Sequence, residues 1–187
     1  MATIAAPPRI SLPPDRDGNG GPRPRKLSTH RTGILLTLAA ISMMFIGLTS
    51  AYVVSQGISP LWKQVSMRPL IWVNTCVLLL SSYTLEQGRR RISAKWLIGT
   101  LVLGLAFLAG QLGVFAQLAN EGLYLSTGRQ ASFYYVLTGL HGLHVLGGIV
   151  ALAWTAANLK RATLEVTSFY WHFMGGLWLY LLLVIFL

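Results

Sequence analysis

The sequence predicts an all-α membrane protein, an antiparallel bundle of five transmembrane helices. Of its 187 residues, 53% are hydrophobic and only 11% are charged, whereas soluble domains carry about 25% charged residues. Five apolar stretches each come close to or exceed the roughly 20 residues that a helix needs to cross a bilayer. The connections between these stretches are short, which favours antiparallel packing of helices that follow each other in the chain.

The elements follow in order along the chain. Residues 1–32 are rich in proline and arginine, and this composition predicts a flexible, basic, cytoplasmic tail. Residues 33–187 form the predicted membrane domain. The second span is the shortest, and Pro69 fits its first turn, where no intrahelical amide bond is lost. The five spans are predicted at 33–54, 67–85, 96–118, 132–159 and 166–187.

The positive charges alternate with the spans. The net charge is +10, and twelve of the 15 Lys and Arg residues lie in the tail or in the loops after the second and fourth spans. Positive residues remain on the cytoplasmic side, so the N-terminus is predicted inside and the C-terminus outside. Anionic lipid headgroups are the expected partners of these charges. No single basic face forms, which argues against a nucleic-acid partner.

Three histidines lie inside predicted spans, at His141, His144 and His172. A buried imidazole costs several kcal/mol unless it finds a polar partner. His141 and His144 share one helix face, but His172 lies at a different depth, and a metal needs three or four ligands. We therefore expect no metal site, and we expect the imidazoles to hydrogen-bond to neighbouring helices or lipid headgroups.

The remaining side chains predict no catalytic centre. None of the five acidic residues lies in the interior of a span, which argues against an autonomous proton carrier and excludes paired-carboxylate catalysis. The single cysteine, Cys76, excludes an internal disulfide and cysteine-based metal sites; we expect it to be a small buried hydrophobe. The other polar residues within the spans are predicted to form interhelical hydrogen bonds: Asn74, Thr75, Ser81, Ser82, Gln111 and Gln117. Two alternatives stay open, a bis-histidine haem carrier and a small solute transporter.

Two motifs near the C-terminus carry a family resemblance. The fourth span contains a Thr-Gly-x-His-Gly-x-His-Val-x-x-Gly pattern, and the fifth contains Tyr-Trp-His-Phe followed by a tryptophan. With weaker matches in the other spans, over about residues 33–187, the chain resembles subunit III of the haem–copper respiratory oxidases in its short, five-helix bacterial form. The resemblance gives these residues structural or lipid-contact roles: Thr138, Gly139, His141, Gly142, His144, Val145, Tyr170, Trp171, His172, Phe173, Trp178, Asn74 and Gln111.

The resemblance implies a non-catalytic subunit of a proton-pumping aa-type cytochrome c oxidase in a bacterial inner membrane. Such a subunit packs on subunit I beside subunit II, binds phospholipids, and supports proton uptake and stable turnover in aerobic respiration. The haems and copper belong to partner subunits, and cytochrome c donates electrons to the complex. Tyr170 favours the cytochrome c type over a quinol oxidase. A quinol oxidase subunit, an accessory protein of nitric oxide reductase, and membership of a larger respiratory assembly all stay open.

The chain departs from the family pattern at three acidic positions. Where family members carry carboxylates, this sequence has Ile41, Val114 and Gly175. Any role of those acids in proton uptake or in pairing with the histidines is therefore not expected here.

Overall fold

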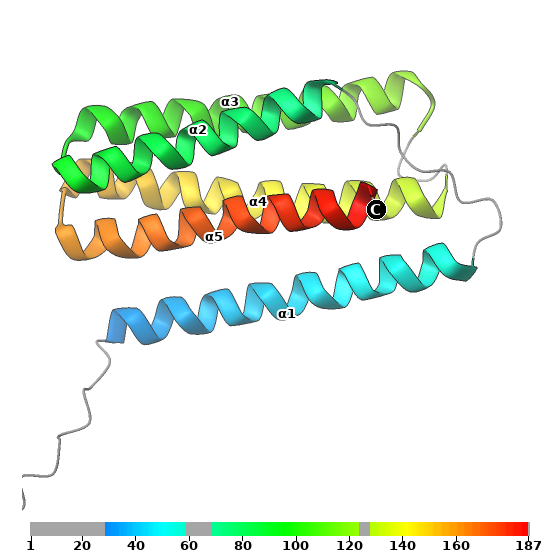
Figure 1. The fold of residues 1–187 in the computed structure, drawn as a ribbon, viewed down its shortest axis with the longest axis horizontal. Helices are drawn as coiled ribbons and strands as arrows, with labels where there is room; N and C mark the ends of the chain where they lie inside the picture. The colour runs from blue at the N-terminus through cyan, green and yellow to red at the C-terminus, as the bar shows by residue number, and fades with distance from the viewer. Residues whose placement is uncertain (1–28, 59–68, 124–127, 187) are drawn as a thin grey trace, which may run out of the picture.

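All regular structure in the described part of the chain is helical. The computed structural model describes residues 29–58, 69–123 and 128–186. Its five helices run antiparallel in chain order (Figure 1), which confirms the predicted all-α class. They are α1 (Thr29–Ile58), α2 (Pro69–Arg91), α3 (Ala94–Asn120), α4 (Arg129–Asn158) and α5 (Arg161–Phe186).

Most of the helices extend past the predicted spans. The helix α1 begins at Thr29, inside the predicted tail, and α2 continues to Arg91, beyond the predicted end at residue 85. The predictions followed apolar side chains, whereas backbone hydrogen bonding continues into the polar ends of a helix. The remainder of the predicted tail, residues 1–28, lies outside the described residues.

Four of the described helices are long and apolar enough to cross a membrane. These are α1 from Thr32, and the whole of α3, α4 and α5. The last two turns of α2 carry Glu86 and three arginines, so its apolar part is shorter. The helix α2 corresponds to the second predicted span, and its crossing of the membrane stays a prediction.

The helices α2 to α5 form a four-helix bundle, and α1 lies at its side. In Figure 1, α2 and α3 lie together above α4 and α5, and the packing contacts link α2 to α3, α3 to α4, α4 to α5 and α5 back to α2. In contrast, α1 contacts α4 and α5 and no other described helix. One cluster of buried apolar side chains fills the four-helix bundle, and a second, smaller one joins α1 to α4 and α5.

The helix ends are defined by local backbone geometry. Gly122 follows α3 with φ +75°, and the next amide, of Leu123, donates to the carbonyl of Leu118 at 3.0 Å. This is the glycine-terminated helix end that the left-handed conformation makes possible. Ile92 and Leu159 adopt positive φ without being glycines and make tight turns after α2 and α4. These turns place the α2–α3 and α4–α5 connections at the same end of the bundle.

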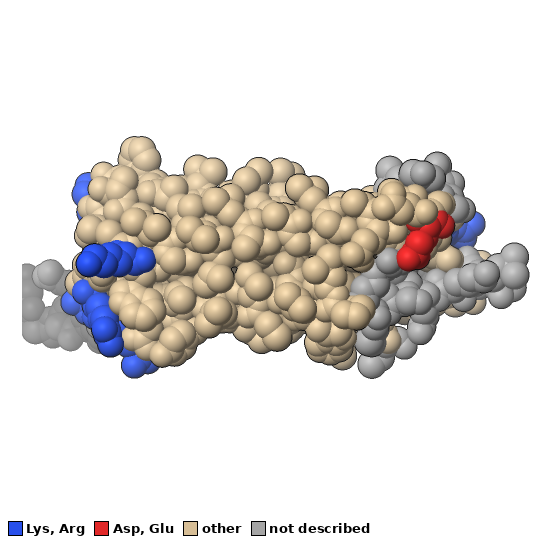
Figure 2. All heavy atoms as spheres, turned by 90° about the horizontal axis from the view of Figure 1, so that it is seen from above, with Lys and Arg blue, Asp and Glu red and all other residues tan. Residues whose placement is uncertain are grey.

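The basic side chains gather at that end. Figure 2 shows Lys and Arg concentrated at one end of the molecule. Arg89 and Arg90 both hydrogen-bond to Glu86 at 2.8 Å, and these bonds lower the pKa of that carboxyl to about 2. Among the described basic side chains only Arg129 belongs to the opposite end, where α4 begins. We call the end with Arg89, Arg90 and Arg161 the basic end.

Candidate functional site

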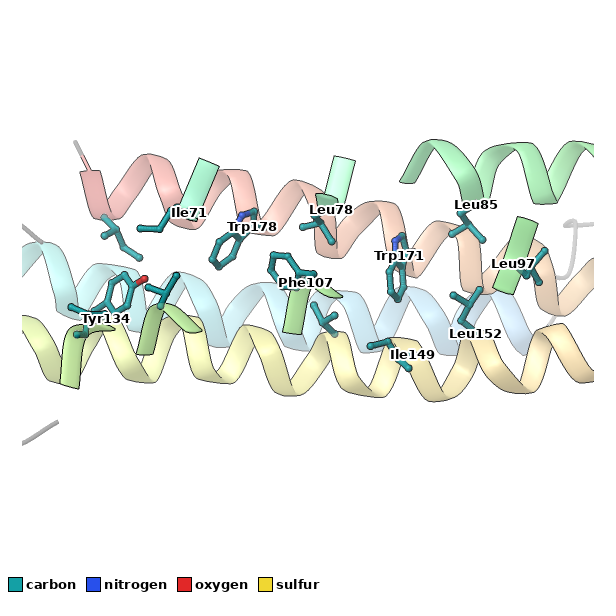
Figure 3. Close-up of a cluster of buried hydrophobic side chains, with 14 of the residues drawn as sticks. Ile71, Leu78, Leu85, Leu97, Phe107, Tyr134, Ile149, Leu152, Trp171 and Trp178 are labelled. Carbon is teal, nitrogen blue, oxygen red and sulfur yellow. The ribbon is translucent and has the colours of Figure 1, made fainter. Parts of the chain in front are cut away.

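Two buried tryptophans of α5 form the centre of the four-helix bundle. Trp171 and Trp178 are 2% and 1% exposed and point between the other helices (Figure 3). The Trp171 indole N–H donates to the hydroxyl of Ser81, and that of Trp178 donates to the hydroxyl of Thr75, both at 3.1 Å. The prediction of interhelical hydrogen bonds is therefore confirmed for Thr75 and Ser81, which fix α5 to α2.

Glycines in α3 and α4 make room for Trp171. A Cβ atom added to Gly104 would lie 2.7 Å from the ring of Trp171, and one added to Gly148 would lie 3.3 Å from it. Only the absence of a side chain lets the helix backbones approach the indole this closely. In contrast, Gly47 and Gly147 have open space around them, so not every glycine of these helices is a packing position.

His141 is sealed inside the bundle beside the second tryptophan. Its side chain is 0% exposed, and its ring stacks on Trp178 with centroids 5.1 Å apart and an interplanar angle of 30°. The ring of Phe107 meets it edge-on at 6.0 Å. Neither ring nitrogen has a hydrogen-bond partner among the described residues, so the expected bond to a neighbouring helix is absent. The amide nitrogens of Asn74 and Gln111 are buried without partners in the same way.

His144 lies at the junction of α1, α4 and α5. It is half-buried, and its Nδ1 lies 2.8 Å from the carbonyl oxygen of Leu140 in its own helix. Its ring meets the edge of Phe45 from α1, with centroids 5.8 Å apart. The hydroxyl of Tyr170 donates to the backbone oxygen of His144 at 2.9 Å. This residue therefore supports packing among the three helices.

His172 faces away from the bundle. Its side chain is exposed on α5, and no hydrogen bond holds its ring among the described residues. The three membrane histidines thus point to three separate surroundings. Within the described ranges, no group of three or more His, Cys, Asp or Glu residues could hold a metal ion.

The other residues of the family motifs lie mainly in the interior. Thr138, Val145, Asn74 and Gln111 are buried. The half-buried positions are Gly139, Gly142, Tyr170 and Phe173.

The three positions where the family carries acids are buried in this structure. Ile41 and Val114, which stand where the family has acids, are buried at 7% and 0% exposure, and Gly175 is buried beside the hydroxyl of Ser82.

Cys76 is exposed, so its prediction as a buried hydrophobe was wrong. The face of α2 that points inward is defined by Asn74, Thr75 and Ser81, and Cys76 falls outside it.

Hydroxyl pairs between helices were missed by the sequence analysis. Thr49 bonds to Tyr180 at 2.9 Å and ties α1 to α5. Pairs between Thr84 and Thr100, and between Thr155 and Thr167, tie α2 to α3 and α4 to α5, each at 2.9 Å. Threonines at positions that share the inward face of a helix are the signal that could have indicated them.

Comparison with known proteins places this arrangement in a family. Residues 27–187 match the family described as cytochrome c oxidase subunit III. Cytochrome c oxidase subunit 3 of a Synechocystis species is 31% identical over 175 residues, which cover 83% of this chain and 74% of the relative.

Two further relatives carry related names. A probable cytochrome c oxidase subunit 3 of Nocardia farcinica is 30% identical over 177 residues, covering 84% of this chain and 85% of the relative. A probable quinol oxidase subunit 3 of Staphylococcus aureus is 31% identical over 134 residues, covering 64% of this chain and 67% of the relative. The chain belongs to the cytochrome c oxidase subunit III family of the haem–copper oxidases.

Proposed function

We propose that this chain is a non-catalytic scaffold of an aa-type cytochrome c oxidase, which packs on the subunit that carries the haems and copper. The supporting observation is the separation of its three membrane histidines. One is enclosed by Trp178 and Phe107, one packs against Phe45, and one faces outward. Such an arrangement offers no pair of axial ligands to a haem and no ligand set to a copper ion.

The chain also has apolar residues or glycine at three positions where the family carries carboxylates, which could support a proton path. The positions occupied by acids in the family are Ile41, Val114 and Gly175 here, all buried. Any support of proton uptake by this chain would therefore act through the fold of its neighbour, which it holds in place in the membrane. Phospholipids at the lipid-facing surface and anionic headgroups at the basic end complete the proposed surroundings.

The orientation and membrane also belong to this proposal. The basic end carries the connections after α2 and α4 (Figure 1), and the Lys and Arg side chains gather there (Figure 2). Positive residues favour the cytoplasmic side, so we place that end in the cytoplasm of a bacterial cell. We also propose that α2 crosses the inner membrane together with the other four helices.

A quinol oxidase is the second candidate, because both names occur among the relatives. Oxygen uptake by the purified complex, driven either by reduced cytochrome c or by a quinol, distinguishes the two donors. We expect cytochrome c to drive uptake.

Purification of the complex through a tag on this chain tests the scaffold role. We expect haem-bearing subunits to copurify, and the isolated chain to show no Soret absorbance and no bound iron or copper. Stoichiometric metal on the isolated chain would refute the proposal.

A variant at the three-helix junction adds a second test. His144→Leu removes the ring nitrogen that contacts Leu140 and alters the packing on Phe45. We expect faster loss of activity during turnover, with the haem spectrum of the complex unchanged. Ser50→Ala on the exposed face of α1 is the control, and it should leave both unchanged.

A further inference from the structure

His172 is the single exposed His, Lys, Arg, Asp or Glu residue in the central part of the described helices. It lies 11 residues beyond Arg161, the first residue of α5, which is about 16 Å along the helix axis. A second measure comes from α2. Trp171 bonds to Ser81, which lies eight residues before Arg89, about 12 Å away. Both measures place the imidazole about 12–16 Å from the basic end along the helix axes.

An imidazole at this depth needs a polar partner, and the described residues do not supply one. Hydrocarbon chains offer no hydrogen bond, and an unpaired polar group in hydrocarbon costs several kcal/mol. Long Lys and Arg side chains can reach the membrane surface from such depths, but a histidine side chain is short. Lipid headgroups are therefore poor partners, and a protein side chain is the better one.

The surface around His172 is shaped to receive a helix. Phe169, Gly176, Leu179 and Leu183 share its exposed face of α5 at helical spacing. Gly176 has open space around it, which allows close approach of another backbone.

Hollows flank this face on both sides. One, of about 330 Å³, lies between α5 and α2 and is lined by Trp72 and Leu183. The other, of about 360 Å³, lies between α5 and α1 and is lined by Ile46 and Gly176. Both linings are almost wholly apolar, so side chains of an apolar helix would fill them.

We infer that the outward face of α5 around His172 binds a transmembrane helix of another oxidase subunit, which presents a hydrogen-bonding side chain to the imidazole. This inference rests on the proposed scaffold role and specifies the surface that performs it. A partner group of hydroxyl, amide or carboxyl type would satisfy the ring. The apolar residues above and below would pack against the partner helix.

Photo-cross-linking in membranes that contain the whole oxidase tests the surface. A benzoyl-phenylalanine is placed at Leu179 on the proposed face or at Val136 on α4 as the control. The two side chains are similarly exposed, at 45% and 43%. They also lie at similar depth, because Tyr170 of α5 bonds to His144 of α4 and the two helices run antiparallel.

We expect position 179 to cross-link to a transmembrane segment of another subunit, and position 136 to give lipid adducts. Lipid adducts alone at position 179, or a cross-link there to a second copy of this chain, would overturn the inference. In those cases copurification of haem-bearing subunits would leave the proposed function intact. Absence of such subunits from the preparation would contradict the proposed function itself.

Substitution of the histidine provides an independent measurement. We expect His172→Leu to weaken retention of the chain by the complex in detergent by roughly three- to fifteenfold, the range of single hydrogen bonds between membrane helices. His172→Gln keeps a hydrogen-bonding group and should restore most of the retention. Leu143→Ala, exposed at a similar depth on α4, should have no effect. Equal retention of His172→Leu and the wild type would contradict the role given to the ring.

Discussion

The space that Gly104 leaves for Trp171 gives the most direct test of the packing. In Gly104→Ala the new methyl carbon would lie 2.7 Å from one ring carbon of Trp171 and 3.2 Å from another. The indole has little freedom to move, because its N–H is bonded to Ser81 and its opposite edge lies against Gly148. Overpacking of this kind costs about 1–3 kcal/mol, and the better helix propensity of alanine returns less than about 1 kcal/mol.

We therefore expect Gly104→Ala to lower the free energy of unfolding by about 1–2 kcal/mol. The assay is unfolding by SDS in mixed micelles, followed by far-ultraviolet circular dichroism. Gly99→Ala in the same helix is the matched control, because no atom lies within 4 Å of its added Cβ. It should leave the stability unchanged or raise it slightly.

A double-mutant cycle separates the clash from a general effect on α3. Trp171→Phe shortens the ring that meets position 104, so the alanine should cost less in that background. We expect a coupling of about 1 kcal/mol, which is within the range for residues in contact. Equal effects of Gly104→Ala and Gly99→Ala, with no coupling to Trp171→Phe, would refute the packing argument.

Three further predictions use the same unfolding assay. His141→Leu keeps the side-chain volume nearly constant and should change the free energy of unfolding by less than about 1.5 kcal/mol, because no hydrogen bond is lost; a loss above about 3 kcal/mol would indicate a bond that the structure lacks. Thr75→Val should cost about 1–3 kcal/mol, since it leaves the buried N–H of Trp178 without its acceptor, and an unchanged stability would contradict that bond. For Glu86 the folded pKa of about 2 lies below the ordinary value of 4.5, so its contribution is present above pH 4.5 and is lost as the pH falls toward 2. Glu86→Gln should remove that part of the pH dependence, by less than about 1 kcal/mol because the pair is near the surface; identical pH curves would show that the pair contributes nothing.

The sequence was sufficient to predict the helices and the family. Apolar stretches of sufficient length predict membrane helices because the backbone must satisfy its own hydrogen bonds in hydrocarbon. The alternation of basic loops predicted that one end of the bundle would collect the arginines, and the structure has this end. The motifs around His141 and Trp171 predicted the family that the comparison then showed.

The direction of each polar side chain required the tertiary structure. His141 and His172 belong to equally apolar stretches, yet one is enclosed and the other is exposed. Cys76, beside the inward-facing Thr75, faces outward. In a membrane both faces of a helix are apolar, so hydropathy carries little information about which face is buried.

The sequence by itself thus determined an all-helical chain with long apolar stretches and the family to which it belongs, because composition, stretch length and motif spacing are properties of the chain alone. Only the tertiary structure decided that Trp171 and Trp178 bond to α2, that His141 has no hydrogen-bond partner among the described residues, and that α1 lies beside the bundle. These facts depend on how helices rotate and approach one another. The rotation and approach of the helices follow from close packing around a few glycines and hydroxyls, and no local sequence pattern encodes them.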